Sequence, residues 1–267
     1  MSAFTRRTFM AASSAAVAAG VLPSRSAGAA ISWMEGGLPE TFPTQDPDVV
    51  REVVLRSHFD YDTVHELVTP RPALAKTSWD WGFGDWESAL GAASHMGRRD
   101  IAELLMEHGA RPNLFTFAML DQVEVVRAVC ETNVGIQALH GPHGITLLDH
   151  AQNGKATRVV EYLETLGGAD VGQPNLPIDE DSARTYAGDY EPRDAAGVVF
   201  HVKFHEKRSV LTFQRDERQL RFLQREGEHV FNPGGAASVR LTFAVSGERA
   251  RALVISDGEL QVRATRR

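Results

Sequence analysis

The chain has 267 residues, a formal net charge of −7 and a single cysteine, Cys130. This length leaves room for one or two domains. The single cysteine excludes an internal disulfide and any metal or redox site built from several cysteines. The acidic balance argues against nonspecific nucleic-acid binding, which needs a basic surface.

The first 29 residues are organised like an export signal. Arg6 and Arg7 precede a weakly apolar, alanine-rich run over 11–22, and small residues at 27–29 provide a cleavage site. The run is too short for a permanent membrane span. The adjacent arginines resemble those of a twin-arginine signal, which implies export of a folded protein. We therefore expect cleavage near Ala29, a periplasmic or secreted mature chain and no membrane span.

Residues 46–170 show a helical pattern that recurs along the chain. Ile101, Leu104 and Leu105 lie at positions i, i+3 and i+4, on one face of a helix. The same spacing starts at Val125 and at Val159, and another apolar residue stands eleven positions before each of the three starts. Recurring pairs of short helices are typical of a solenoid. We expect leucines such as Leu105 and Leu163 to lie in its core.

Two motifs within this region resemble those of the ankyrin-repeat family. Residues 88–93 and 146–151 resemble the T-P-L-H-x-A opening of a repeat, and residues 109–113 resemble its G-A-D-x-N ending except at Arg111. The resemblance implies about four repeats over 46–170. The first is irregular, and the third is short because Ile101 and Val125 are 24 residues apart, against a family period of about 33. Membership would imply protein binding through the concave face and finger tips, without catalytic apparatus.

Residues 79–86 are the strongest candidate for a protein-binding surface. Gly82 and Gly84 permit a tight turn, so the segment is predicted to be a finger between repeats. Large aromatic rings beside acids are typical of the centre of a binding surface. The alternative is that the rings pack into neighbouring repeats. The predicted protein-binding residues are Trp79, Trp81, Phe83, Asp85 and Trp86.

Residues 171–181 are predicted to be a linker, because they contain two prolines and no apolar periodicity. The charge changes at the same place. Residues 30–181 hold 10 Lys and Arg against 24 Asp and Glu, a net charge of −14. Residues 182–267 hold 15 against 11, a net charge of +4. The opposite charges would also allow the acidic repeats to dock on the basic half of the chain.

Residues 182–267 are predicted to form a small antiparallel β-domain. Apolar and polar residues alternate over 198–205 and 238–245, which indicates strands with one buried face. The opening residues 186–191 and the ending 263–266 resemble a lipocalin-like domain of unknown function that follows β-lactamase-related serine hydrolases. The S-x-x-K motif of those hydrolases does not occur in this sequence. The predicted fold is α+β: an ankyrin helical solenoid followed by a small antiparallel β-barrel or lipocalin-like domain.

No metal site, cofactor or catalytic residue is expected. His140, His143, Asp149 and His150 are donor types that zinc accepts, but a finger turn and a repeat helix also explain them. We expect an exported protein-binding scaffold and not an enzyme. One alternative is a small-ligand carrier that uses the interior of the β-domain, where inward Arg or His in a wide cavity would favour a ligand. The other is an enzyme whose site forms between the two domains.

Overall fold

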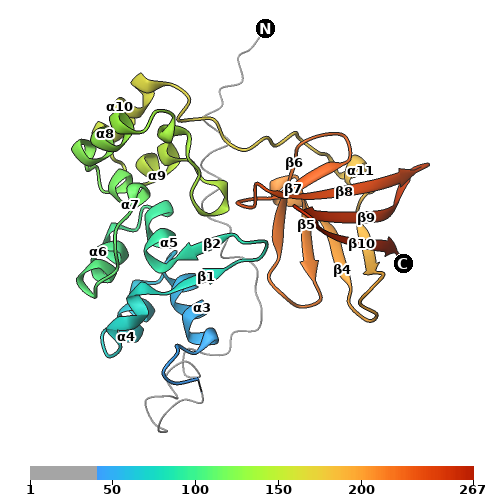
Figure 1. The fold of residues 1–267 in the computed structure, drawn as a ribbon, viewed down its shortest axis with the longest axis horizontal. Helices are drawn as coiled ribbons and strands as arrows, with labels where there is room; N and C mark the ends of the chain where they lie inside the picture. Colours follow the sequence, from blue (N-terminus) through green and yellow to red (C-terminus); the bar gives the residue numbers. More distant parts are fainter. Residues whose placement is uncertain (1–40) are drawn as a thin grey trace. The chain divides into compact units, whose positions relative to one another are not determined.

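The computed structural model describes residues 41–267, so the predicted export signal over 1–29 lies outside the described residues. The described chain divides into two compact units (Figure 1). The first unit is helical and contains residues 41–79 and 86–171. The second is a β-barrel and contains residues 172–267 together with the short segment 80–85.

The helical unit consists of short helices joined by tight turns. Among the described residues, no helix combines the length and the apolar character needed to cross a membrane. The elements in chain order are α3 (Pro47–Arg56), α4 (Tyr61–Val68), η3 (Pro72–Lys76), β1 (Ser78–Asp80), β2 (Trp86–Ser88), α5 (Ala89–His95), α6 (Arg99–Glu107), α7 (Leu114–Met119), α8 (Val123–Thr132), η4 (Ile136–Ala138), η5 (Pro142–Gly144), α9 (Leu147–Asn153) and α10 (Thr157–Leu166).

Several of these helices begin at a polar side chain that caps the free backbone amides. Asp46 accepts hydrogen bonds at the start of α3, Ser88 at the start of α5 and Asn113 at the start of α7. Thr146 and Asp149 cap α9 reciprocally, which satisfies two amides that the helix itself leaves unbonded. These caps fix where the helices start, and therefore where each turn projects.

The helices of the first unit pack in two rows. The helices α3, α5, α7 and α9 contact one another in that order, while α4 contacts α6 and α8 contacts α10. Gly97 and Gly154 lie in turns so close to the next layer that a β-carbon at either position would collide with backbone. Leu105 and Leu163 are fully buried, which confirms the prediction that both are core residues.

The second unit is a closed antiparallel barrel with the strand order β10-β3-β4-β5-β6-β7-β8-β9. The prediction of a small antiparallel β-barrel is therefore confirmed. The chain enters it through the short helix α11 (Glu180–Ala183), and η6 (Glu206–Arg208) connects two of the strands. The strands are β3 (Gly188–Pro192), β4 (Phe200–His205), β5 (Val210–Arg215), β6 (Arg221–Arg225), β7 (Val230–Pro233), β8 (Val239–Ser246), β9 (Arg249–Asp257) and β10 (Leu260–Arg266).

Aromatic and aliphatic side chains fill the interior of the barrel. Tyr190, Phe231 and Phe243 are almost completely buried. The ring of Phe243 lies 5.8 Å from that of Tyr190 and 5.5 Å from that of Phe231, centroid to centroid. The Tyr190 hydroxyl donates a hydrogen bond to the carbonyl oxygen of Tyr186 at 2.6 Å, which satisfies its polar end. The alternation of apolar and polar residues along the strands thus places the apolar side chains inside the barrel, where they form a packed core.

Candidate functional site

The predicted aromatic finger is a hairpin formed by β1 and β2. Its turn is closed by a hydrogen bond of 3.0 Å from the amide of Trp81 to the carbonyl oxygen of Asp85. Gly82, Phe83 and Gly84 all have positive φ angles, a conformation that glycine adopts without strain. The two glycines therefore make the tight turn possible.

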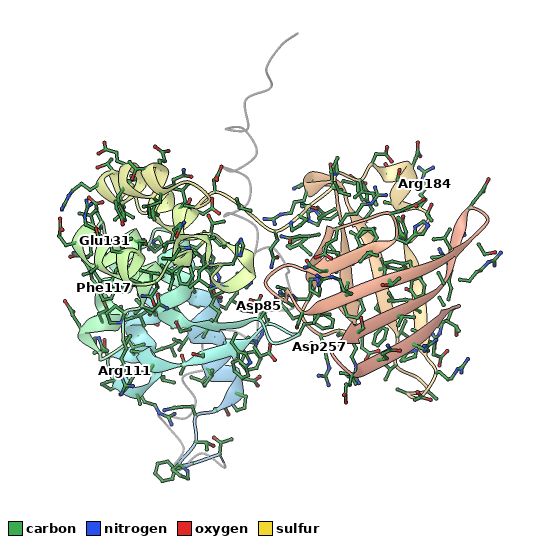
Figure 2. The ribbon with its side chains drawn as sticks, turned by 45° about the horizontal axis from the view of Figure 1, so that its top comes forward. Asp85, Arg111, Phe117, Glu131, Arg184 and Asp257 are labelled. Atoms are coloured by element: carbon green, nitrogen blue, oxygen red, sulfur yellow. The ribbon has the colours of Figure 1, made fainter. Side chains whose placement is uncertain are left out.

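The tip of this hairpin, residues 80–85, belongs to the barrel unit. Trp81 and Asp85 are 1 % and 2 % exposed. The Asp85 carboxylate, marked in Figure 2, lies 2.6 Å from the guanidinium of Arg221. The ring of Phe83 packs 5.5 Å from that of Phe213 in the barrel core. Three of the predicted binding residues are thus engaged within the barrel unit.

The other two predicted residues lie in the helical unit. Trp86 on β2 is 63 % exposed, the largest exposure of any tryptophan in the described part of the chain. Trp79 on β1 is half-buried. The structure therefore divides the predicted set and leaves Trp86 as its most accessible member.

The side chain next to Trp86 points into the protein and forms the centre of a buried cluster. The Glu87 carboxylate lies 2.9 Å from Nε2 of His95, and 3.3 Å from Nε2 of both His58 and His143. Glu87 and His95 have fully buried side chains, that of His58 is 2 % exposed and that of His143 is 12 % exposed. One donor atom from each of the four residues lies within 4.8 Å of the donor atoms of the other three. We call these four residues the histidine cluster.

Each member of the histidine cluster comes from a different part of the helical unit. His58 follows α3, Glu87 lies in β2, His95 is the last residue of α5 and His143 lies in η5. The Nδ1 atom of His58 is 3.1 Å and 3.0 Å from the carbonyl oxygens of Val54 and Leu55, so it donates to the backbone. That contact turns Nε2 of His58 toward Glu87.

Burial and the neighbouring charged groups shift the pKa values of the histidine cluster in opposite directions. Burial raises the pKa of Glu87, but the three surrounding histidines together hold that pKa well below its usual value. Burial lowers the pKa of His95, against the opposing effect of Glu87. Burial also lowers the pKa of the neighbouring His150 to about 3. At neutral pH, the site therefore combines a carboxylate with a neutral imidazole at His95.

The four possible zinc ligands that lie close together in the sequence do not meet at one site in the structure. His140 contacts the carbonyl oxygen of Val171 at 2.8 Å, and Asp149 caps α9. His150 contacts the carbonyl oxygen of Thr146 at 2.8 Å. Of this set, His143 alone reaches the histidine cluster. The other three members were not predicted from the sequence, because they come from different elements and share no local motif.

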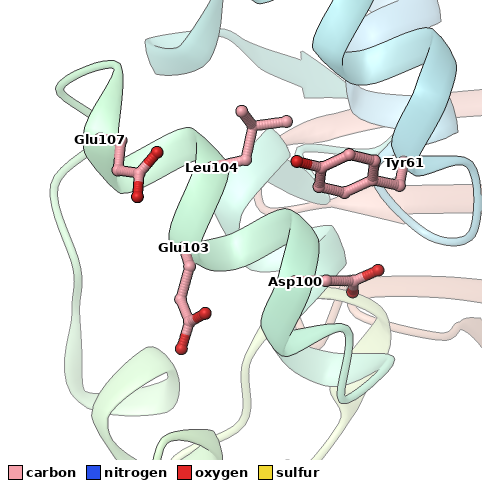
Figure 3. Close-up of a pocket in the computed structure, with 5 residues that line it drawn as sticks. All are labelled: Tyr61, Asp100, Glu103, Leu104 and Glu107. Atoms are coloured by element: carbon pink, nitrogen blue, oxygen red, sulfur yellow. The ribbon is translucent and has the colours of Figure 1, made fainter.

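An open hollow on the surface of the helical unit lies beside α4 and α6 (Figure 3). Asp100 on its edge is bound by Arg98, with 2.6 Å between nitrogen and oxygen. The arginine holds the pKa of this carboxyl below its usual value, mainly through their hydrogen bond. The hollow is an acidic, aromatic-edged surface. It is lined by Tyr61, Asp100, Glu103, Leu104 and Glu107.

Comparison with known protein families and with curated proteins gives no match to this sequence. The candidate residues are therefore interpreted from their geometry and chemistry. Trp86 offers an accessible aromatic surface on the helical unit. The histidine cluster offers a buried set of nitrogen and oxygen donors, and it includes Glu87, the residue that follows Trp86 in β2.

Proposed function

We propose that this chain is an exported protein-binding scaffold whose helical unit is an array of ankyrin-type repeats. Short helices pair with the helices that follow them, as α5 does with α6, and the pairs contact one another row by row. Nearest-neighbour stacking of this kind is what a repeat array requires. The close-packed turn glycines Gly97 and Gly154 also support it.

The observation that carries the proposal is the exposure of Trp86. A tryptophan side chain that is 63 % exposed leaves a large apolar area in water. Aromatic residues of this kind are enriched at the centres of protein interfaces, where they bury much area at a low cost in conformational entropy. Trp86 lies on β2, next to the tip of the predicted finger, and finger tips are among the surfaces that the ankyrin resemblance assigns to partner binding.

The charge of the helical half indicates the chemistry of the partner. Residues 30–181 carry a net charge of −14, and the open hollow at α4 and α6 adds an acidic surface. A partner with a basic patch would be attracted by this field, and its association rate would fall as salt increases. We propose a basic protein surface with a pocket for an aromatic ring.

The test is the substitution Trp86→Ala, with Leu260→Ala as a matched control. Leu260 is 64 % exposed but lies on the barrel, so the two changes remove equally exposed apolar side chains from different units. Removing an interface hot spot of about 2 kcal/mol weakens binding roughly 30-fold. We expect that loss for the proteins that the mature chain captures from an envelope extract, while the melting temperature stays unchanged.

The proposal fails if Trp86→Ala and Leu260→Ala retain the captured proteins equally well. A large drop in melting temperature for Trp86→Ala would instead mean that the ring supports the fold. An affinity measured at two salt concentrations then tests the charge argument, because attraction between an acidic surface and a basic partner weakens as salt increases.

The second candidate function is transport of a small ligand inside the barrel. The filled interior of the barrel argues against it. The interior positions are occupied by packed rings and aliphatic side chains such as Phe231 and Leu241. Arg221 does point inward, which would suit an anionic ligand, but Asp85 of the hairpin tip already neutralises it. Protein binding therefore accounts better for the structure than transport of a ligand inside the barrel.

A further inference from the structure

The donor atoms of the histidine cluster lie close enough together to surround one metal ion. Zinc is bound by imidazole nitrogen and carboxylate oxygen at about 2.0–2.2 Å, so two ligands of a tetrahedral ion lie about 3.3–3.5 Å apart. Oε1 of Glu87 lies 2.9 Å from Nε2 of His95, and Oε2 of Glu87 lies 3.3 Å from Nε2 of His58 and 3.3 Å from Nε2 of His143. All four donor atoms lie within 4.8 Å of one another. Small shifts of the side chains would place one ion at the centre.

The orientation of the imidazoles supports the same conclusion. Because Nδ1 of His58 donates to the carbonyl oxygens of Val54 and Leu55, a neutral ring turns the lone pair of Nε2 toward Glu87. Metal-binding histidines are commonly held by such a contact through the other ring nitrogen. Nε2 of the fully buried His95 faces the Glu87 carboxylate at 2.9 Å, and its Nδ1 has no hydrogen-bond partner within the described part of the chain. A buried imidazole in that state is suited to bind a cation.

We propose that His58, Glu87, His95 and His143 bind one zinc ion as a structural site. Three imidazoles and one carboxylate suit zinc, whereas magnesium and calcium prefer oxygen ligands. The four residues supply all the ligands of a tetrahedral ion and leave no position for a substrate, so the site is structural and not catalytic. The ion would connect the end of α3, β2, α5 and η5.

The zinc site goes beyond the proposed protein binding and does not depend on it. Trp86 and Glu87 point to opposite sides of β2, one exposed and one buried. Zinc would hold the loop of His143 against the helices and so stabilise the unit that presents Trp86. Loss of zinc binding and loss of partner binding can therefore be measured separately.

The test uses the untagged mature chain, stripped of metal with a chelator and titrated with zinc in competition with a coloured indicator. We expect one zinc ion per chain, and cobalt should give the intense visible absorption of a tetrahedral ion. X-ray absorption of the zinc-loaded protein should show only nitrogen and oxygen ligands at about 2.0–2.2 Å, with imidazole scattering. This spectroscopy on the unaltered protein needs no variant.

The matched variants are His143→Ala and His140→Ala, which remove histidines from the same loop. His143 contacts Glu87, whereas His140 contacts the carbonyl oxygen of Val171. Losing a ligand should weaken zinc binding by more than roughly 100-fold, since losing even a supporting contact costs about 10- to 100-fold. His140→Ala should change the affinity little. The proposal is overturned if the unaltered chain binds neither zinc nor cobalt, or if both variants bind zinc as tightly as it does.

Discussion

Two neighbouring residues of β2 lie in opposite environments. Successive side chains in a strand point to opposite faces, so Trp86 and Glu87 cannot share an environment. Trp86 is 63 % exposed, while Glu87 is 1 % exposed and bound by histidines. A substitution at Trp86 should therefore leave the histidine cluster intact, which keeps the binding test and the zinc test independent of each other.

A second residue-scale prediction concerns the apolar core of the helical unit. Leu163 and Leu166 both lie in α10, but Leu163 is fully buried and Leu166 is 41 % exposed. Leu163→Ala leaves a cavity, so it should reduce the free energy of unfolding by about 2–5 kcal/mol. Leu166→Ala should cost less, because the side chain of Leu166 is already partly in water and gains less free energy from burial. Leucine and alanine also both favour helices.

Denaturant unfolding followed by circular dichroism measures both changes. Equal losses for Leu163→Ala and Leu166→Ala would contradict the burial of the helix face that carries Leu163. A loss below about 0.5 kcal/mol at Leu163 would do the same, because changes of that size are typical of surface positions.

At the scale of the elements, the sequence predicts what depends on local pattern. The strand alternation over 198–205 and 238–245 leads to β4 and β8, and the helical spacing around Ile101 and Val159 leads to α6 and α10. The small antiparallel barrel follows from the same alternation. These features could be predicted because the period of apolar side chains reports on which face of an element is buried. The face predicted from Val125 is wrong, because α8 buries Val123, Val126 and Cys130 and leaves Val125 37 % exposed.

The hairpin shows where local pattern is insufficient. The glycines predict the turn at 82–84, but nothing local indicates that Trp81 and Asp85 join the barrel unit. The partner of Asp85 is Arg221, far along the chain. The histidine cluster escapes prediction for the same reason, since His58 and His143 meet only through tertiary packing. A set of donors from four separate segments leaves no spacing that could be read from the sequence.

At the scale of the whole molecule, export is the first proposal to test. Replacing Arg6 and Arg7 by lysine keeps the charge but removes the paired guanidinium groups that a twin-arginine signal presents. We expect the uncleaved protein to accumulate in the cytoplasm, which fractionation and immunoblotting would show. If the double variant is cleaved and reaches the envelope normally, another export route carries this protein.

Partner binding by the acidic helical half is the central claim, and crosslinking in living cells tests it most directly. A photo-crosslinking amino acid at position 86 would capture whatever protein lies against Trp86, while the same group at Leu260 reports on an equally exposed site. We predict a discrete crosslinked product in the envelope fraction from position 86 and its absence from position 260. No product at position 86, or the same products from both positions, would contradict a binding surface at Trp86.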